Sequence, residues 1–182
     1  MNALVLHVDE SPVKINGEQF YLYNIFNVKH TLQYITKHGR QEDIDKFGFL
    51  REYKWIIVHD HYKMYYNYVA DNAECNVHVL RYLNVVVEFT NHTWAKELHD
   101  LLLSMKKIKE EYMENGKQYL EILERAEVER KRNLSTNAYK KEEIDLINRL
   151  IKYRRNHLLF LKKFFVPFSN NRAESDLRGI KI

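Results

Sequence analysis

The hydrophobic pattern of the chain changes near residue 90, and this change constrains the fold more than any other feature of the sequence. Before that point, short runs of β-branched and aromatic residues are separated by turn residues, a pattern typical of strands. After it, apolar residues recur at intervals of three and four, as they do along one face of a helix. The sequence therefore predicts an α/β protein with a strand-rich first part and a helix-rich second part.

Four strands are predicted in the first part, over Leu4–Val8, Gln19–Phe26, Thr31–Thr36 and Lys54–His59. Asn16-Gly17 separates the first two and is a strong hairpin signal. A polar stretch over Arg40–Phe47 predicts a short helix after the third strand, and a second helix is predicted over Asn76–Phe89. The expected order is a three-stranded meander, a short helix and then the fourth strand.

The second part predicts long helices. One begins at Trp94, and another begins near Ile144 and runs to about Phe165, where Pro167 stops it. Ser169-Asn170-Asn171 then offers caps for a final helix.

Composition narrows the class of protein. A chain of 182 residues is one domain, or one domain with an insertion. The single cysteine, Cys75, excludes an internal disulfide and fits a reducing compartment. There is no signal-peptide pattern and no apolar run near the roughly 20 residues that span a bilayer. We therefore expect no membrane association and a cytoplasmic protein.

Charge is distributed unevenly along the chain. Residues 1–90 carry 9 Lys and Arg against 11 Asp and Glu, a net −2, whereas residues 91–182 carry 20 against 14, a net +6. A basic helical half would suit nucleic acid. Helix surfaces that are simply exposed to solvent and rich in Lys and Glu would give the same distribution of charge.

Three acidic residues stand at positions that suit a metal site. Asp9 and Asp60 each follow an apolar, β-branched run, and Glu174 falls in the first turn of the predicted final helix. If the first strand neighbours the fourth, the two aspartates converge at one sheet edge. Carboxylates in such an arrangement hold two divalent ions about 3.5–4 Å apart, which cut and join phosphodiester bonds. Taken singly, each acid is ordinary, since aspartates end strands and glutamates favour helix starts.

The residues around these acids resemble the catalytic core of insertion sequence 66 family transposases. The matching strings are His7–Val13, Val58–Lys63, Ala73–Leu83, Trp94–Leu98 and Val166–Glu174, in the order of the family. The resemblance implies a ribonuclease-H-like mixed sheet with an inserted α-helical subdomain. It also implies that Asp9, Asp60 and Glu174 bind two Mg²⁺ or Mn²⁺ ions for catalysis.

The implied activity is metal-dependent cleavage at transposon ends, followed by attack of the freed 3′-hydroxyl on target DNA. DNA is the implied partner, together with self-association. The expected domains are residues 1–90 as the first part of the core, 91–166 as the helical insertion and 167–182 as the start of the helix carrying Glu174. The separation of 114 residues from Asp60 to Glu174 far exceeds what one connecting helix requires, which also indicates an insertion.

The chain departs from the family pattern in places. Ser175 stands where family members commonly have arginine, and neither an amino-terminal DNA-binding region nor the end of the last motif is present. We therefore expect a truncated copy. Two other readings stay open: an inactive remnant or DNA-binding module without catalysis, and a nuclease that hydrolyses without joining.

Further residues are expected to contact DNA or to stabilise the fold. The DNA-contacting set is Lys63, Arg172, Arg178, Arg154 and Arg155. The last two belong to a basic stretch that could instead be a solvated helix face. Cys75 and His78 form a C-x-x-H pair with too few partners for a zinc site, so we expect a structural role. The tyrosines at 62, 65, 66 and 68 are expected to pack in the core rather than to stack on bases.

Overall fold

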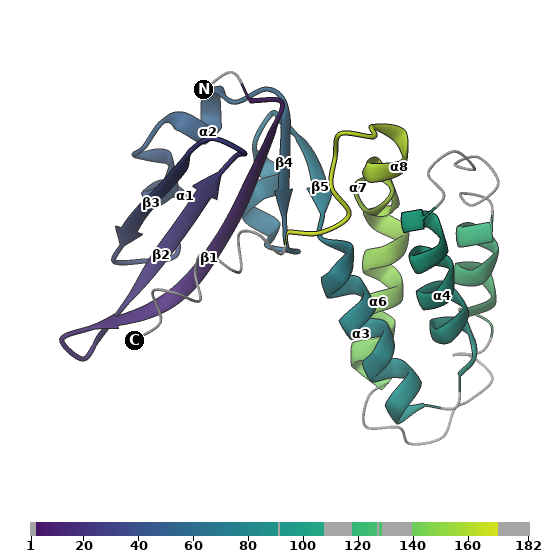
Figure 1. The fold of residues 1–182 in the computed structure, drawn as a ribbon. Coiled ribbons are helices and arrows are strands. Elements are labelled where there is room, and N and C mark those ends of the chain that lie inside the picture. Colours follow the sequence, from purple (N-terminus) through teal and green to yellow (C-terminus); the bar gives the residue numbers. More distant parts are fainter. Residues whose placement is uncertain (1–2, 91, 108–117, 127, 129–139, 171–182) are drawn as a thin grey trace. The chain divides into compact units, whose positions relative to one another are not determined.

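The structure is a computed structural model, and it describes residues 3–90, 92–107, 118–126, 128 and 140–170. The chain divides into two compact units, residues 1–75 with 165–182 and residues 76–164. We call them the sheet unit and the helical unit. Figure 1 shows the strands of the first and the helices of the second.

The sheet unit contains one five-stranded mixed sheet in the order β3-β2-β1-β4-β5. Its strands are β1 (Val5–Ile15), β2 (Glu18–Phe26), β3 (Thr31–Thr36), β4 (Ile56–His59) and β5 (Asp71–Glu74). β2 is antiparallel to both β1 and β3, whereas β4 is parallel to both β1 and β5. The predicted α/β class and the meander are confirmed, and the first strand does neighbour the fourth, which was the condition for the two aspartates to converge.

The β1–β2 hairpin forms at the predicted turn. Asn16 and Gly17 both have positive φ, at 50° and 83°, which is the backbone of a type I′ turn. β1 is longer than predicted and continues from Val8 to Ile15, because its pairing with β2 extends to Ile15↔Glu18. Pro12 interrupts the apolar pattern but lies beyond the part of β1 that pairs with β4, where a missing N–H is tolerated.

One face of the sheet carries the hydrophobic core. Leu6, Val8 and Ile57 are fully buried on it. Three short elements cover this face: α1 (Gln41–Asp45), α2 (Phe49–Glu52) and the 3₁₀ helix η1 (Lys63–Asn67). These elements contribute Ile44, Leu50, Met64 and Tyr65 to the core.

The tyrosine cluster belongs to this packing, as predicted. Tyr65 and Tyr68 are buried in the core, and Tyr62 packs against it. Tyr62 donates a hydrogen bond to the Gly39 carbonyl and Tyr68 donates one to Asp45, each at 2.9 Å. Hydrogen bonds from the tyrosine hydroxyls to groups inside the fold offset the cost of burying those hydroxyls together with the rings.

The fifth strand was not predicted. β5 reads Asp-Asn-Ala-Glu, which carries none of the β-branched or aromatic residues that favour strands. It forms because β4 offers it a parallel partner, from Ile56↔Asp71 to His59↔Glu74.

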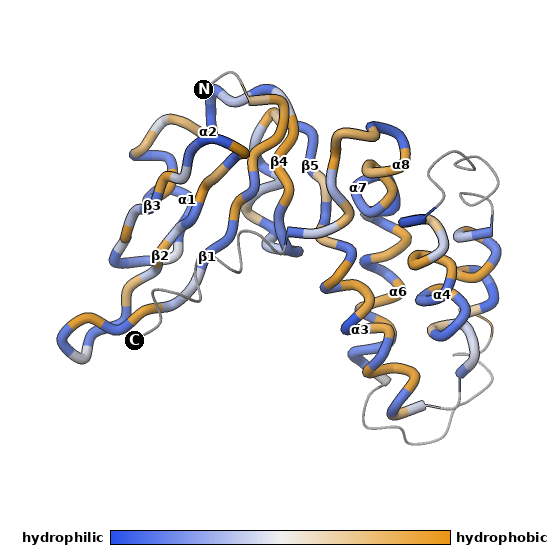
Figure 2. The backbone as a smooth tube through the Cα atoms, in the orientation of Figure 1, coloured by the Kyte–Doolittle hydropathy of each residue, from blue (hydrophilic) through white to orange (hydrophobic). Residues whose placement is uncertain are grey.

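The helical unit contains α3 (Asn76–Phe89), α4 (Trp94–Lys107), α6 (Lys140–Lys152), α7 (Arg154–His157) and α8 (Leu159–Lys162), and residues 118–126 are also helical. Buried residues recur at helical spacing, as with Val79, Leu83 and Val86 in α3. Figure 2 shows the resulting alternation of hydrophobic and hydrophilic segments along α3 and α6. The predicted helix over Asn76–Phe89 is confirmed.

The predicted helix from Ile144 to about Phe165 is wrong in its length. Three helices occupy this range, because the backbone leaves helical geometry at Tyr153 (φ −104°, ψ 21°) and Leu158 (φ −95°, ψ 6°). Buried Leu158, Phe160 and Leu161 keep the apolar spacing that suggested one helix. The predicted final helix with Glu174 lies outside the described residues.

A buried glutamate joins helices inside the helical unit. Glu143 of α6 is 2% exposed, and one of its oxygens accepts hydrogen bonds from Trp94 Nε1 at 2.9 Å and from His92 Nδ1 at 2.6 Å. The buried stripe of α6 therefore includes one acidic residue, which is hydrogen-bonded to side chains from outside α6. No helix in the described ranges combines the length and apolar character needed to cross a bilayer.

Substituting Gly17 by alanine tests the turn that sets the β1–β2 register. A Cβ on Gly17 would meet no heavy atom within 4 Å, so only the positive φ opposes the change. We expect Gly17→Ala to lower the free energy of unfolding by roughly 1 kcal/mol, measured by urea denaturation. Lys14→Ala, on the same hairpin, is the control and should change stability little; equal stability of both variants would contradict the turn assignment.

Candidate carboxylate site

The parallel pairing of β1 with β4 brings two predicted site residues together. The register runs from Val5↔Ile56 to His7↔Val58. Asp9 lies two residues after His7 and is still in β1, and Asp60 lies two residues after Val58, directly after β4. Because both strands run in the same direction, their carboxylates meet at the same edge of the sheet.

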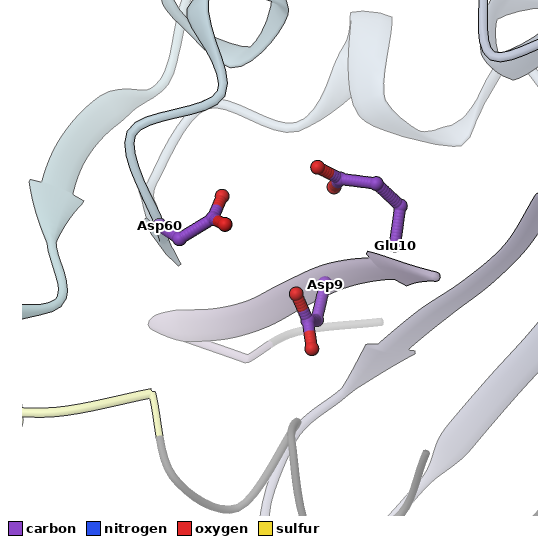
Figure 3. A group of neighbouring side chains, drawn as sticks. All are labelled: Asp9, Glu10 and Asp60. Atoms are coloured by element: carbon purple, nitrogen blue, oxygen red, sulfur yellow. The ribbon is translucent and has the colours of Figure 1, made fainter. Parts of the chain in front are cut away.

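A third carboxylate, which was not predicted, completes the group. Asp9, Glu10 and Asp60 each offer an oxygen, and these atoms all lie within 4.8 Å of one another. Figure 3 shows the three side chains around the end of β4 and the middle of β1. All three residues are half-buried.

Glu10 approaches the group from the core face of the sheet. Side chains alternate along a strand, so Glu10 shares its face with buried Leu6 and Val8. Tyr65, which is fully buried, donates a hydrogen bond to Glu10 Oε2 at 2.6 Å. The position of Glu10 two residues after Val8 on the apolar stripe is the sequence signal that could have identified it.

The surroundings of Glu10 favour its protonated form. Burial is the largest cause, followed by the negative charge of Asp60, and together with Asp9 they raise the pKa of Glu10 to about 8 against the opposing Tyr65 bond. A carboxylic acid at this position keeps the metal-free group from holding three like charges.

Asp60 has an oxygen suited to a cation. Its Oδ1 is buried and has no hydrogen-bond partner in the part of the chain that the structure describes. A buried carboxylate oxygen is stabilised by a positive partner, and carboxylate oxygens are the ligands that Mg²⁺ and Mn²⁺ prefer. The residues present therefore fit a hard divalent ion.

The histidines on either side of Asp60, His59 and His61, both contact polar groups of the sheet unit. His59 is fully buried; its Nε2 lies 3.0 Å from Asn72 Oδ1, and its Nδ1 lies against the Asp60 carbonyl oxygen. Burial lowers the pKa of His59, which favours the neutral ring. His61 Nδ1 lies 2.9 Å from Glu74, a buried acid that also accepts a hydrogen bond from Tyr66.

The other predicted site residues lie elsewhere or outside the description. Lys63 is exposed at the start of η1, three residues after Asp60. Arg155 is exposed and Arg154 half-buried in α7 of the helical unit. Glu174, Arg172 and Arg178 lie outside the described residues.

The Cys75–His78 pair remains a prediction. Cys75 is fully buried at the end of the sheet unit, and its Sγ accepts a hydrogen bond from the Asn170 backbone N–H at 3.1 Å. His78 belongs to α3 in the helical unit, where Arg81 lies 3.3 Å from its Nε2.

The raised pKa of Glu10 predicts how the stability of the metal-free protein depends on pH. The folded state holds this proton more tightly than the unfolded state, so the free energy of unfolding should fall as pH rises from about 5 to 8. The limiting slope is roughly 1.4 kcal/mol per pH unit. Urea denaturation across this range should give a flatter profile for Glu10→Gln. The exposed Glu52→Gln is the control, and parallel profiles for Glu10→Gln and the parent would contradict the burial of Glu10.

Comparison with known proteins assigns the chain to a family. The family model described as "Transposase IS66 family" matches residues 1–182. No curated protein and no solved structure matches the chain. A transposase family implies transposase function and DNA as the partner, and it suggests the use of divalent metal, for which Asp9, Glu10 and Asp60 form an acidic cluster. The chain belongs to the Transposase IS66 family.

Proposed function

We propose that this chain is the catalytic domain of a DNA transposase in which Asp9, Asp60 and Glu174 hold two Mg²⁺ or Mn²⁺ ions. The observation that carries the proposal is the approach of the Asp9 and Asp60 carboxylates to within 4.8 Å from two parallel strands. When bound, two such ions activate the attacking oxygen and stabilise the leaving oxygen of a phosphodiester. The proposed reaction is cleavage at transposon ends followed by 3′-hydroxyl strand transfer.

The sheet supports a ribonuclease-H-like assignment. Three antiparallel strands are followed by two parallel ones, and the acids gather where parallel strands end. The separation of residues 76–164 as a compact helical unit supports an insertion within the core, proposed at 91–166. Residues 1–90 and 167–182 are the proposed parts of the core, the second carrying Glu174.

Each residue of the group has a separate proposed role. Asp9 and Asp60 supply carboxylate oxygens to the ions, and the Asp60 Oδ1, which has no hydrogen-bond partner among the described residues, supports this role. Glu10, whose proton is favoured by burial and by Asp60, limits repulsion within the group before metal binds. Lys63, Arg172 and Arg178 are proposed to contact the phosphates of the DNA, with Lys63 exposed three residues beyond Asp60.

The helical unit is proposed to bind the DNA backbone. Arg154 and Arg155 form the start of α7, and Lys162 is exposed at the end of α8. Arg149 and Lys152 of α6 lie over the rings of Tyr82 and Tyr153, at 5.2 and 5.0 Å from the ring centres. Phosphate contacts need positive charge at suitable spacing and little else.

Thermal unfolding with and without Mn²⁺ tests the proposed site. Mn²⁺ at about 100 times its dissociation constant should stabilise the parent by roughly 2.7 kcal/mol. Asp60→Asn should abolish most of this shift, whereas Asp71→Asn, at an exposed position of β5, should retain it. An equal shift in Asp60→Asn and the parent would overturn the site. No shift in a parent that unfolds cooperatively would favour an inactive remnant.

Salt titration of DNA binding tests the helical surface. The logarithm of the association constant should fall with the logarithm of salt concentration, with a slope of about −0.9 per phosphate contact. Arg154→Ala/Arg155→Ala should weaken binding and reduce this slope by about 2. The control is Lys106→Ala/Lys107→Ala, which removes two exposed charges from the end of α4. The same loss in both double variants would indicate only a general charge effect.

A further inference from the structure

The segment that follows α8 belongs to the sheet unit and contains a buried asparagine. Val166, Phe168 and Asn170 are 0%, 7% and 0% exposed, and the segment has no regular secondary structure. Two of these residues are apolar and need only a dry surface, but a buried asparagine requires hydrogen-bond partners. The partners of Asn170 therefore indicate which parts of the sheet unit this residue joins.

The side-chain amide of Asn170 is bonded to β1 directly before Asp9. Its Nδ2 donates a hydrogen bond to the Val8 carbonyl at 2.8 Å. A carbonyl only accepts, so this contact fixes the orientation of the amide, and His7 Nδ1 then donates to Asn170 Oδ1 at 2.8 Å. The His7 ring is itself stacked on Phe26 of β2, with the ring centres 4.6 Å apart. Both ends of the amide are therefore bound to the two residues of β1 that precede Asp9.

The backbone of Asn170 is bonded on the side of the second aspartate. Its N–H donates a hydrogen bond at 3.1 Å to the Sγ of Cys75, the buried residue directly after β5. The Cys75 N–H donates one at 2.8 Å to the carbonyl of His59, the last residue of β4. Asp60 comes next in the chain. Asn170 is thus connected through one hydrogen bond to the strand carrying Asp9, and through two to the strand leading to Asp60.

These contacts lie where the direct pairing of β1 with β4 stops. That pairing runs only as far as His7↔Val58, whereas β4 and β5 stay paired up to His59↔Glu74. In the sheet that the structure describes, the residues directly before the two aspartates, Val8 and His59, are therefore not a strand pair. Asn170 supplies a connection between them that the strand pairing does not.

The separation of the two aspartates depends on this part of the sheet. Asp9 and Asp60 directly follow the connected residues, so a change in the distance between the strand ends moves one carboxylate relative to the other. Their oxygens lie within 4.8 Å of each other. Two oxygens bound to the same Mg²⁺ lie at most about 4.2 Å apart, because each lies about 2.1 Å from the ion. A hard divalent ion therefore tolerates little further separation of the two strand ends.

We propose that Asn170 is a positioning residue that joins the ends of β1 and β4 and so sets the separation of Asp9 and Asp60. This inference rests on the proposed function, because it assigns both aspartates to one metal site. Asn170 does not bind the metal; it acts on metal affinity through the strand ends on which the two ligands stand.

A double-mutant cycle on metal affinity tests this inference. Mn²⁺ binding is measured by isothermal titration calorimetry for the parent, Asn170→Ala, Asp60→Asn and the double variant. Outer residues that orient metal ligands typically contribute 10–100-fold in affinity, so Asn170→Ala should weaken binding by about tenfold or more. Asp60→Asn already removes one of the two ligands whose separation matters. The loss in the double variant should therefore fall short of the product of the two single losses.

A matched control separates positioning from general loss of stability. Asn27 is another buried asparagine of the sheet unit, and in the turn between β2 and β3 its Oδ1 accepts hydrogen bonds from the N–H groups of Lys29 at 2.7 Å and His30 at 3.0 Å. Asn27→Ala should lower the unfolding temperature yet leave Mn²⁺ affinity unchanged. If Asn170→Ala does not fold, Asn170→Ser, which keeps a small polar side chain but is too short for both β1 contacts, takes its place in the cycle.

The outcomes distinguish this inference from the proposed function. Parent-like affinity in the folded Asn170 variant, or single losses that multiply in the double variant, overturns the inference and leaves the metal site in place. An equal loss in Asn27→Ala also overturns it, because affinity would then follow stability alone. Parent-like affinity in Asp60→Asn overturns the metal site and the inference together. A loss in the Asn170 variant that shrinks in the Asp60→Asn background supports it.

Discussion

The parallel pairing of β1 with β4 is the interaction on which the carboxylate site depends. It spans only Val5↔Ile56 to His7↔Val58, yet it fixes where both aspartates lie. A slip of one residue would turn one aspartate to the other face of the sheet. The slip is opposed by burial, since Leu6 and Ile57 are both fully buried at neighbouring positions. The register of the acids is therefore set by apolar side chains that take no part in their chemistry.

The group gathers acids from both faces of one strand. Asp9 and Glu10 are neighbours in β1, so their side chains leave the strand on opposite faces of the sheet. Glu10 comes from the core side, where Tyr65 holds it, and burial raises its pKa to about 8. The same group thus contains an aspartate, Asp60, with a buried oxygen that has no hydrogen-bond partner among the described residues, and a glutamic acid whose surroundings favour its protonated form. The Transposase IS66 family, to which the chain belongs, suggests the use of divalent metal, and this group is an acidic cluster of the kind that could hold one.

Much of the sheet and part of the site follow from the sequence, and the failures have physical causes. Asn16-Gly17 predicts the hairpin because few other residues adopt its backbone. Asp9 and Asp60 were found because they end apolar runs. Glu10 and β5 were missed, since tertiary contacts with Tyr65 and β4 stabilise residues that local preference disfavours. The breaks at Tyr153 and Leu158 were missed because buried residues keep helical spacing across them.

The sheet unit is discontinuous in sequence, with residues 76–164 lying between its two parts. A ribosome makes the chain in order, so all five strands and the whole helical unit emerge before Val166, Phe168 and Asn170 do. Until then, Val8 and Cys75 lack the partners that Asn170 provides. The β1–β4 pairing that brings the two aspartates together therefore uses segments made before the helical unit, whereas the contacts of Asn170 need a segment made after it.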